Sequence, residues 1–289
     1  MERKGNILWT PGGFLAPYPQ ASRPSGPGYL QPVRQLLPVP TGAGQLEADP
    51  IECYASDARP RPPDRPWVLA NMVSSADGAA TSMGTSGGLG SAADKAAFGA
   101  IRAVADVILV AAGTVRAERY RAAQTPPHQQ QRRRDRGQSV HPRFCVLSAG
   151  LDLDPTAGLF NSGDDRPPPL VATTSRAPAD RRRQLEAVAE VVAFGQERVE
   201  LHPLLQHLAD VWGAGVVLCE GGPSLIGQLV AEDLIDEFCL TVSPMAVGGP
   251  ATRIAHASVD QAGRPLHLDR VLEADGLLLL RYHRDRSVG

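Results

Sequence analysis

The chain has 289 residues, of which 43% are apolar, and it carries 29 basic and 31 acidic side chains for a formal net charge of −2. A chain of this length and composition can bury a sizeable core, which excludes disorder throughout. The near balance of charge gives no electrostatic reason to bind a polyanion, so nucleic acid is not expected as a partner.

The first 66 residues hold 13 of the 26 prolines. Proline fixes the backbone and lacks an N–H donor, so this segment is expected to sustain neither a regular helix nor a central strand. Residues 1–31 are predicted to form a disordered or extended head, and residues 32–66 an arm packed on the globular body by a few apolar side chains. Residues 67–289 are predicted to form the main domain.

From residue 67 onward, short apolar runs alternate with amphipathic stretches, which is typical of βα units and a mainly parallel sheet. The runs lack strict alternation, as expected for strands covered on both faces. Strands are predicted at residues 67–74, 106–112, 143–148, 169–173, 215–219 and 236–244, with a hairpin over 266–284.

Helices are predicted between these strands. The best signalled begins after Ser91, because Ser91 and Asp94 form an S-x-x-D capping pattern and apolar residues then repeat at helical spacing. Residues 180–188, 201–211 and 224–231 show the same periodicity. Residues 120–143, with a Q-Q-Q-R-R-R-D-R run, show none and are predicted to form a mobile surface loop with a solvated charged face.

Several function classes lose support from absent patterns. No stretch approaches the roughly 18 apolar residues of a membrane span, and the N-terminus lacks an apolar signal segment. The four cysteines form no C-x-x-C pair, so a reduced, cytoplasmic protein without a disulfide framework is expected. No metal-hydrolase, Walker A or G-x-G-x-x-G pattern occurs, so no metal site is expected.

A glycine-rich segment at residues 84–88 matches the G-x-S-x-G nucleophile elbow around Ser86. That elbow needs a strand entering the serine and a helix leaving at once, whereas further glycines intervene here before Ser91. We interpret the segment as a flexible loop that lets the backbone approach a ligand closely.

Two turns follow directly on predicted strands. In C-E-G-G-P-S-L, residues 219–225, the glycines at 221 and 222 would present free helix amides to a phosphate; the alternative is a plain strand-to-helix turn capped by Ser224. The turn at residues 113–118 places Glu118 four residues after Thr114. Since open α/β sheets bind ligands at the carboxyl ends of their strands, the two turns are expected to converge. Asp77, which ends the first strand, is either a turn-former or a catalyst.

These motifs form an ordered series: N-M-V-S-S-A-D-G at residues 71–78, S-G-G-L-G at 86–90, A-D-V-I-L-V-A-A-G-T-V-R-A-E at 105–118, C-E-G-G-P-S-L at 219–225 and L-I-D-E-F-C-L-T-V-S-P at 234–244. The series resembles the reductase domain of the bifunctional riboflavin-biosynthesis deaminase/reductase and its stand-alone actinobacterial relatives. The resemblance covers about residues 32–284.

The resemblance implies a dihydrofolate-reductase-like α/β fold, with a mainly parallel central sheet, helices on both faces and a C-terminal antiparallel hairpin. It implies a homodimer that uses NADPH to reduce a small molecule, 5-amino-6-(5-phosphoribosylamino)uracil, to its ribitylamino form. The alternatives are a pterin or dihydrofolate reductase and a nucleotide-binding protein of this fold without catalysis.

The resemblance also assigns roles to individual residues. The cofactor would be bound by Val73, Thr114, Ser148, Gly221, Gly222, Pro223, Ser224 and Leu225. The substrate would be bound by Ser86, Arg102 and Glu220. The chemistry of the reduction, rather than the resemblance, requires a proton for the opening sugar, and we expect Glu118 or Asp77 to supply it through a bound water, with Glu118 favoured.

Two features depart from the family pattern. Glu118 stands where the bifunctional enzyme has an aspartate, and the arginine expected to bind the substrate phosphate has no clear counterpart. Arg116 and Arg176 are the candidates for recognising a 2′-phosphate on the cofactor.

Overall fold

The computed structural model describes residues 32–39, 47–164 and 166–286. The chain divides into two units, Met1–Leu30 and Gln31–Gly289, and the described residues belong to the second. The expected head at residues 1–31 lies outside the described residues. Among the described helices, none is long and apolar enough to cross a membrane.

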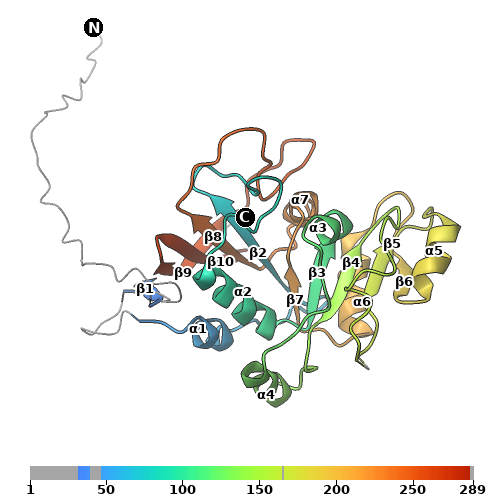
Figure 1. Ribbon diagram of the computed structural model, residues 1–289, viewed down its shortest axis with the longest axis horizontal. Coiled ribbons are helices and arrows are strands. Elements are labelled where there is room, and N and C mark those ends of the chain that lie inside the picture. The colour runs from blue at the N-terminus through green and yellow to red at the C-terminus, as the bar shows by residue number, and fades with distance from the viewer. Residues whose placement is uncertain (1–31, 40–46, 165, 287–289) are drawn as a thin grey trace, which may run out of the picture. The chain divides into compact units, whose positions relative to one another are not determined.

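In the described part of the chain, ten strands form one sheet in the order β1-β9-β10-β8-β2-β7-β3-β4-β5-β6 (Figure 1). The strands are β1 (Arg34–Leu37), β2 (Trp67–Ser75), β3 (Val107–Ala111), β4 (Arg143–Leu147), β5 (Leu170–Thr173), β6 (Glu190–Ala193), β7 (Val216–Cys219), β8 (Glu237–Ser243), β9 (Leu266–Ala274) and β10 (Leu277–Arg284). Strands β2 to β8 pair in parallel, whereas β1, β9 and β10 pair antiparallel at one end.

Helices cover both faces of this sheet. They are α1 (Pro50–Ser56), α2 (Ala92–Val104), α3 (Ala112–Ala117), α4 (Pro127–Asp135), α5 (Ala179–Glu186), α6 (Leu201–Asp210) and α7 (Pro223–Ala231). Strand β3 is apolar at every position because helices cover it on both faces of the sheet. Ile108 packs in a core with residues of α1 and α2, and Leu109 packs on the other face with residues of α6 and α7. The predicted α/β fold, with its parallel sheet and C-terminal hairpin, is confirmed.

The predicted helix after Ser91 is confirmed as α2. The Ser91 Oγ atom accepts hydrogen bonds from the backbone N–H groups of Ala93 and Asp94 at 3.1 and 3.3 Å. This cap fixes the first turn of α2, which contributes to the site described below.

The expectation that residues 32–66 sustain no regular helix is wrong. Helix α1 begins at Pro50, and the Asp49 side chain caps it by accepting from the Ile51 N–H at 2.8 Å. Proline is favoured at the first helical position because its missing N–H would have no intrahelical partner there.

The prediction of a mobile loop at residues 120–143 is also wrong in part, because α4 lies within this segment. Arg133 is fully buried, and its guanidinium donates to the carbonyls of Ala103 and Ala105 at 3.0 and 2.7 Å, at the end of α2. A polar side chain, rather than an apolar stripe, anchors this helix, so hydrophobic periodicity gave no signal.

Candidate active site

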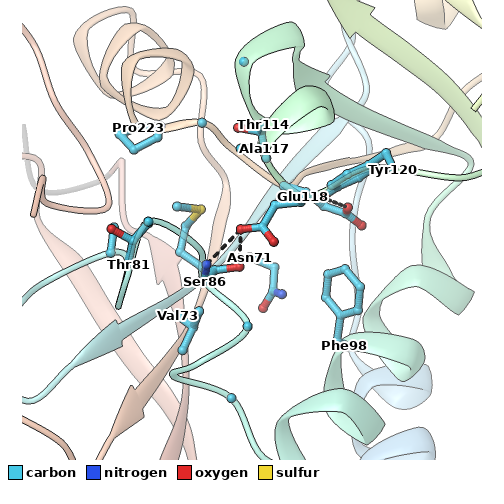
Figure 2. Close-up of a pocket in the computed structure, with 18 of the residues that line it drawn as sticks. Asn71, Val73, Thr81, Ser86, Phe98, Thr114, Ala117, Glu118, Tyr120 and Pro223 are labelled. Carbon is cyan, nitrogen blue, oxygen red and sulfur yellow. Dashed lines mark hydrogen bonds between the residues drawn. The ribbon is translucent and has the colours of Figure 1, made fainter. Parts of the chain in front are cut away.

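A cavity of about 470 Å³ lies at the carboxyl ends of β2, β3 and β7 (Figure 2). Its walls come from the end of β2, the glycine-rich loop before α2, the first turns of α2, helix α3 and the turn between β7 and α7. A cavity at the carboxyl ends of parallel strands is the expected position for a ligand in an open α/β sheet.

The two strand-end turns converge on this cavity, as predicted. Thr114 and Gly222 both line it, and a Cβ atom added at Gly222 would lie 2.8 Å from Thr114 Oγ1. The Ala111 N–H donates to the Gly221 carbonyl at 2.8 Å, which ties the two turns together. Gly221 has φ +86°, a conformation that favours glycine.

The turn after β7 leads directly into α7. Gly222 is its N-cap residue, no side chain caps the helix, and Pro223 occupies the first turn. Ser224 therefore lies inside the helix and is exposed, so the alternative in which it caps the turn is wrong. An uncapped helix N-terminus that lines a cavity is suited to hold an anion.

Glu118 follows α3 and projects into the cavity (Figure 2). Its Oε1 atom accepts hydrogen bonds from the Ser86 backbone N–H and hydroxyl at 2.8 and 2.9 Å. The second carboxylate oxygen has no hydrogen-bond partner among the described residues. Glu118 thus anchors the glycine-rich loop and keeps one oxygen for a ligand.

Glu220 is held in a buried cluster beside the cavity. Arg102 donates to both of its carboxylate oxygens at 2.7 Å, and the Tyr120 hydroxyl donates to Oε2 at 2.7 Å. Burial acts to lower the pKa of Arg102, but the adjacent Glu220 outweighs it and raises that pKa; burial and Glu220 both raise the pKa of Tyr120. Arg102 does not line the cavity, and its guanidinium neutralises the charge of the Glu220 carboxylate.

Asp77 lies away from the cavity wall. Its carboxylate accepts from the Ser75 hydroxyl and from the backbone N–H groups of Val247 and Gly248, the latter at 3.1 and 2.7 Å. These hydrogen bonds, led by that from Ser75, lower the pKa of Asp77 to about 2. Such an acid is ionised at neutral pH and is poorly suited to donate a proton. These contacts favour the turn-forming alternative for Asp77.

The remaining sequence candidates divide into two sets. The cavity wall includes Val73, Ser86, Thr114, Glu118, Glu220, Gly222 and Pro223, but not Asp77, Arg102, Ser148, Gly221, Ser224 or Leu225. Both 2′-phosphate candidates have acidic partners, Asp152 for Arg116 and Glu197 for Arg176.

Three cavity residues on α2 are not among the site residues predicted from the sequence: Asp94, Lys95 and Phe98. Asp94 accepts from the Thr241 hydroxyl at 2.7 Å, and burial raises the pKa of its carboxyl. Asp94 and Phe98 are four residues apart, so they share one face of the helix. That spacing was visible in the sequence, but the partner on β8 was not.

Residues 66–273 match the family described as the RibD C-terminal domain. The chain belongs to this family. A 2,5-diamino-6-ribosylamino-4(3H)-pyrimidinone 5′-phosphate reductase from Archaeoglobus fulgidus is 32% identical over 64% of this chain and 83% of its own length. A reductase of the same name from Methanothermobacter thermautotrophicus is 29% identical over 75% of this chain and 92% of its own length.

A solved structure supports the same membership in the RibD C-terminal domain family. The pyrimidine reductase-like protein from Corynebacterium diphtheriae superimposes with a TM-score of 0.70 at 27% identity, covering 77% of this chain and 93% of that one. The resemblance stated from the motifs is therefore confirmed.

Proposed function

We propose that this chain uses NADPH to reduce a 5′-phosphorylated ribosylaminopyrimidine of riboflavin biosynthesis to its ribitylamino form. The observation that carries the proposal is the joint placement of Glu118 and the uncapped α7 terminus on one cavity, in a chain of the RibD C-terminal domain family. The names of the relatives support the same reaction.

The residues present fit a nicotinamide dinucleotide. The close approach of Gly222 to Thr114 brings two backbone turns to one cavity wall. The N-terminus of α7, which no side chain caps, suits a phosphate group of the cofactor. A bound dihydronicotinamide supplies the hydride, so the chain needs no nucleophile of its own. The chain must instead bind the cofactor and the substrate, orient them toward each other and exclude water from between them.

Glu118 is the residue we assign to proton transfer. Opening of the ribose ring requires a proton at the ring oxygen, and the oxygen of Glu118 that Ser86 does not bind is available within the cavity. Ser86 holds the carboxyl in place through its Oε1 atom. Glu220 cannot take this role readily, because Arg102 and Tyr120 engage both its oxygens.

The first turns of α2 would bind the pyrimidine and its phosphate. Asp94 can accept from a ring N–H and a 2-amino group, and Phe98 offers a ring face beside it. Lys95 is the one basic side chain among the described cavity residues. Since Arg102 is paired with Glu220, we assign the substrate phosphate to Lys95.

A pterin carries the same pair of donors as a 2-aminopyrimidinone, so the placement of Asp94 also favours dihydrofolate as a second candidate substrate. A nucleotide-binding protein without catalysis is the third possibility. Steady-state NADPH oxidation separates the three. We expect turnover with the 2,5-diaminopyrimidinone or the aminouracil phosphoribosyl compound, and little with dihydrofolate.

Two outcomes of that assay would overturn the proposal. Faster turnover with dihydrofolate would favour the pterin function. No NADPH oxidation with any of the substrates, in a folded protein that binds NADPH, would favour the non-catalytic protein. The homodimer and the cytoplasmic location stay predictions; sedimentation of the purified chain tests the first.

A further inference from the structure

The β9–β10 hairpin carries a cluster of two histidines and one aspartate that the reductase function does not use. His267 on β9 pairs directly opposite His283 on β10, and Asp269 lies two residues further along β9, where the register between the two strands shifts. His283 also pairs with Glu237 at the beginning of β8, whereas the cavity lies at the carboxyl end of the sheet. The cluster is therefore at the opposite edge from the candidate active site.

The three side chains converge on one point. Asp269 Oδ1 lies 3.1 Å from Nδ1 of His267 and 2.8 Å from Nδ1 of His283. The imidazole ring centroids are 5.0 Å apart. One ligand atom from each residue lies within 4.8 Å of the other two. Zinc–nitrogen bonds of 2.0 to 2.1 Å in a tetrahedral site separate ligand atoms by about 3.4 Å, which these side chains reach with small rotations.

The Asp269 carboxylate is also held by a hydrogen bond to its other oxygen. Arg281 donates to Asp269 Oδ2 at 2.6 Å, and the same guanidinium donates to buried Glu237 at 2.9 Å. This leaves Oδ1 directed at the two imidazoles. Carboxylates that bind metals are commonly held by further hydrogen bonds of this kind.

The geometry points to a binding site for a divalent transition-metal ion of the zinc class, formed by Nδ1 of His267, Nδ1 of His283 and Oδ1 of Asp269. Two imidazoles and one carboxylate form a donor set that Zn²⁺ accepts, and water would complete the tetrahedron. Each neutral imidazole binds through the Nδ1 lone pair and carries its proton on Nε2. The ion joins the beginning of β9 to the end of β10.

The site would stabilise the fold through mass action, since the unfolded chain does not hold the three ligands together. It does not depend on the proposed reductase function. Its failure and that of the reductase proposal are therefore distinguishable.

Isothermal titration of the EDTA-treated, desalted full chain with ZnCl₂ tests this site. We expect one tight site, with the affinity lowered at least about tenfold in His267→Gln and His283→Gln, because even the loss of an outer partner commonly costs that much. His202→Gln, which changes an exposed histidine of α6, is the matched control and should bind like the parent. Circular dichroism establishes that each variant is folded.

A second measurement separates this site from the thiols. Co²⁺ bound to nitrogen and oxygen ligands shows d–d absorption without a thiolate charge-transfer band, and half-buried Cys53 is the thiol to be distinguished. Zinc should also raise the Tm of the parent and not of the two histidine variants. Absence of binding, affinity unchanged in both variants, or a thiolate band would overturn the proposal.

Discussion

Replacement of Glu118 by glutamine removes the ionisable carboxyl group while keeping the size of the side chain. The amide oxygen can still accept the two hydrogen bonds that Oε1 now receives from the Ser86 N–H and hydroxyl. The glycine-rich loop should therefore keep its position, and the substitution leaves the α7 terminus unaltered. The change isolates proton transfer from binding.

General acid catalysis by a positioned side chain contributes about 10²- to 10⁴-fold to a rate. We expect kcat of Glu118→Gln to fall within that range, equivalent to about 3 to 5 kcal/mol of transition-state stabilisation. The Kd for NADPH should stay within about twofold of the parent value. Stopped-flow NADPH oxidation gives the first quantity, and fluorescence titration gives the second.

Ser86→Ala is the control for this experiment. It removes the hydroxyl donor but keeps the backbone N–H donor to Glu118, so its effect on kcat should be far smaller than that of Glu118→Gln. Unchanged turnover in Glu118→Gln would refute the assigned role. A loss of NADPH affinity equal to the loss of turnover would show that Glu118 acts in binding.

Three further predictions concern binding and stability. Gly222→Val places a Cβ 2.8 Å from Thr114 Oγ1 and should weaken NADPH binding at least tenfold, about 1.4 kcal/mol. A Cβ in the control variant Gly99→Ala meets no atom within 4 Å, so NADPH affinity should not change. Equal NADPH affinities of the two variants in titration would contradict this prediction. Lys95→Gln should raise the KM of the phosphorylated substrate about tenfold, because its phosphate loses a charged partner. The KM of the dephosphorylated substrate should stay unchanged. Equal effects on the two KM values would show that Lys95 does not bind the phosphate. The pKa of Asp77 is lowered from 3.8 to about 2 in the folded chain, so ionised Asp77 stabilises the fold above about pH 4 and this contribution is lost as pH falls toward 2. The Tm difference between the parent and Asp77→Asn should therefore shrink over that interval. A constant Tm difference would contradict the assigned hydrogen bonds.

Local signals in the sequence were sufficient for much of the fold. The apolar run of β3 predicted a strand covered on both faces, and Ser91 predicted the beginning of α2. The glycines at 221 and 222 placed a turn at the end of β7, and parallel strands bring such turns to one edge. Signals within a few residues of each other were enough in each case.

Helix α1 was missed although its cap is local, whereas two other features depend on a partner distant in the chain. Helix α4 is anchored by Arg133, whose guanidinium binds carbonyls about 30 residues earlier. The capping pattern around Asp94 gives no sign of its hydrogen bond with Thr241, 147 residues later. The pairing of Arg102 with Glu220, 118 residues away, is a further contact of this kind, and the substrate-binding role of Arg102 stays a prediction. No local pattern specifies such contacts.

The transfer of deuterium from NADPH labelled at both C4 positions tests the central claim most directly. The product of a reaction with the phosphoribosylaminopyrimidine is analysed by mass spectrometry and NMR. We predict a ribitylamino product with one deuterium at the sugar carbon that bears the amine. Consumption of NADPH with an unlabelled product would contradict direct hydride delivery in this cavity.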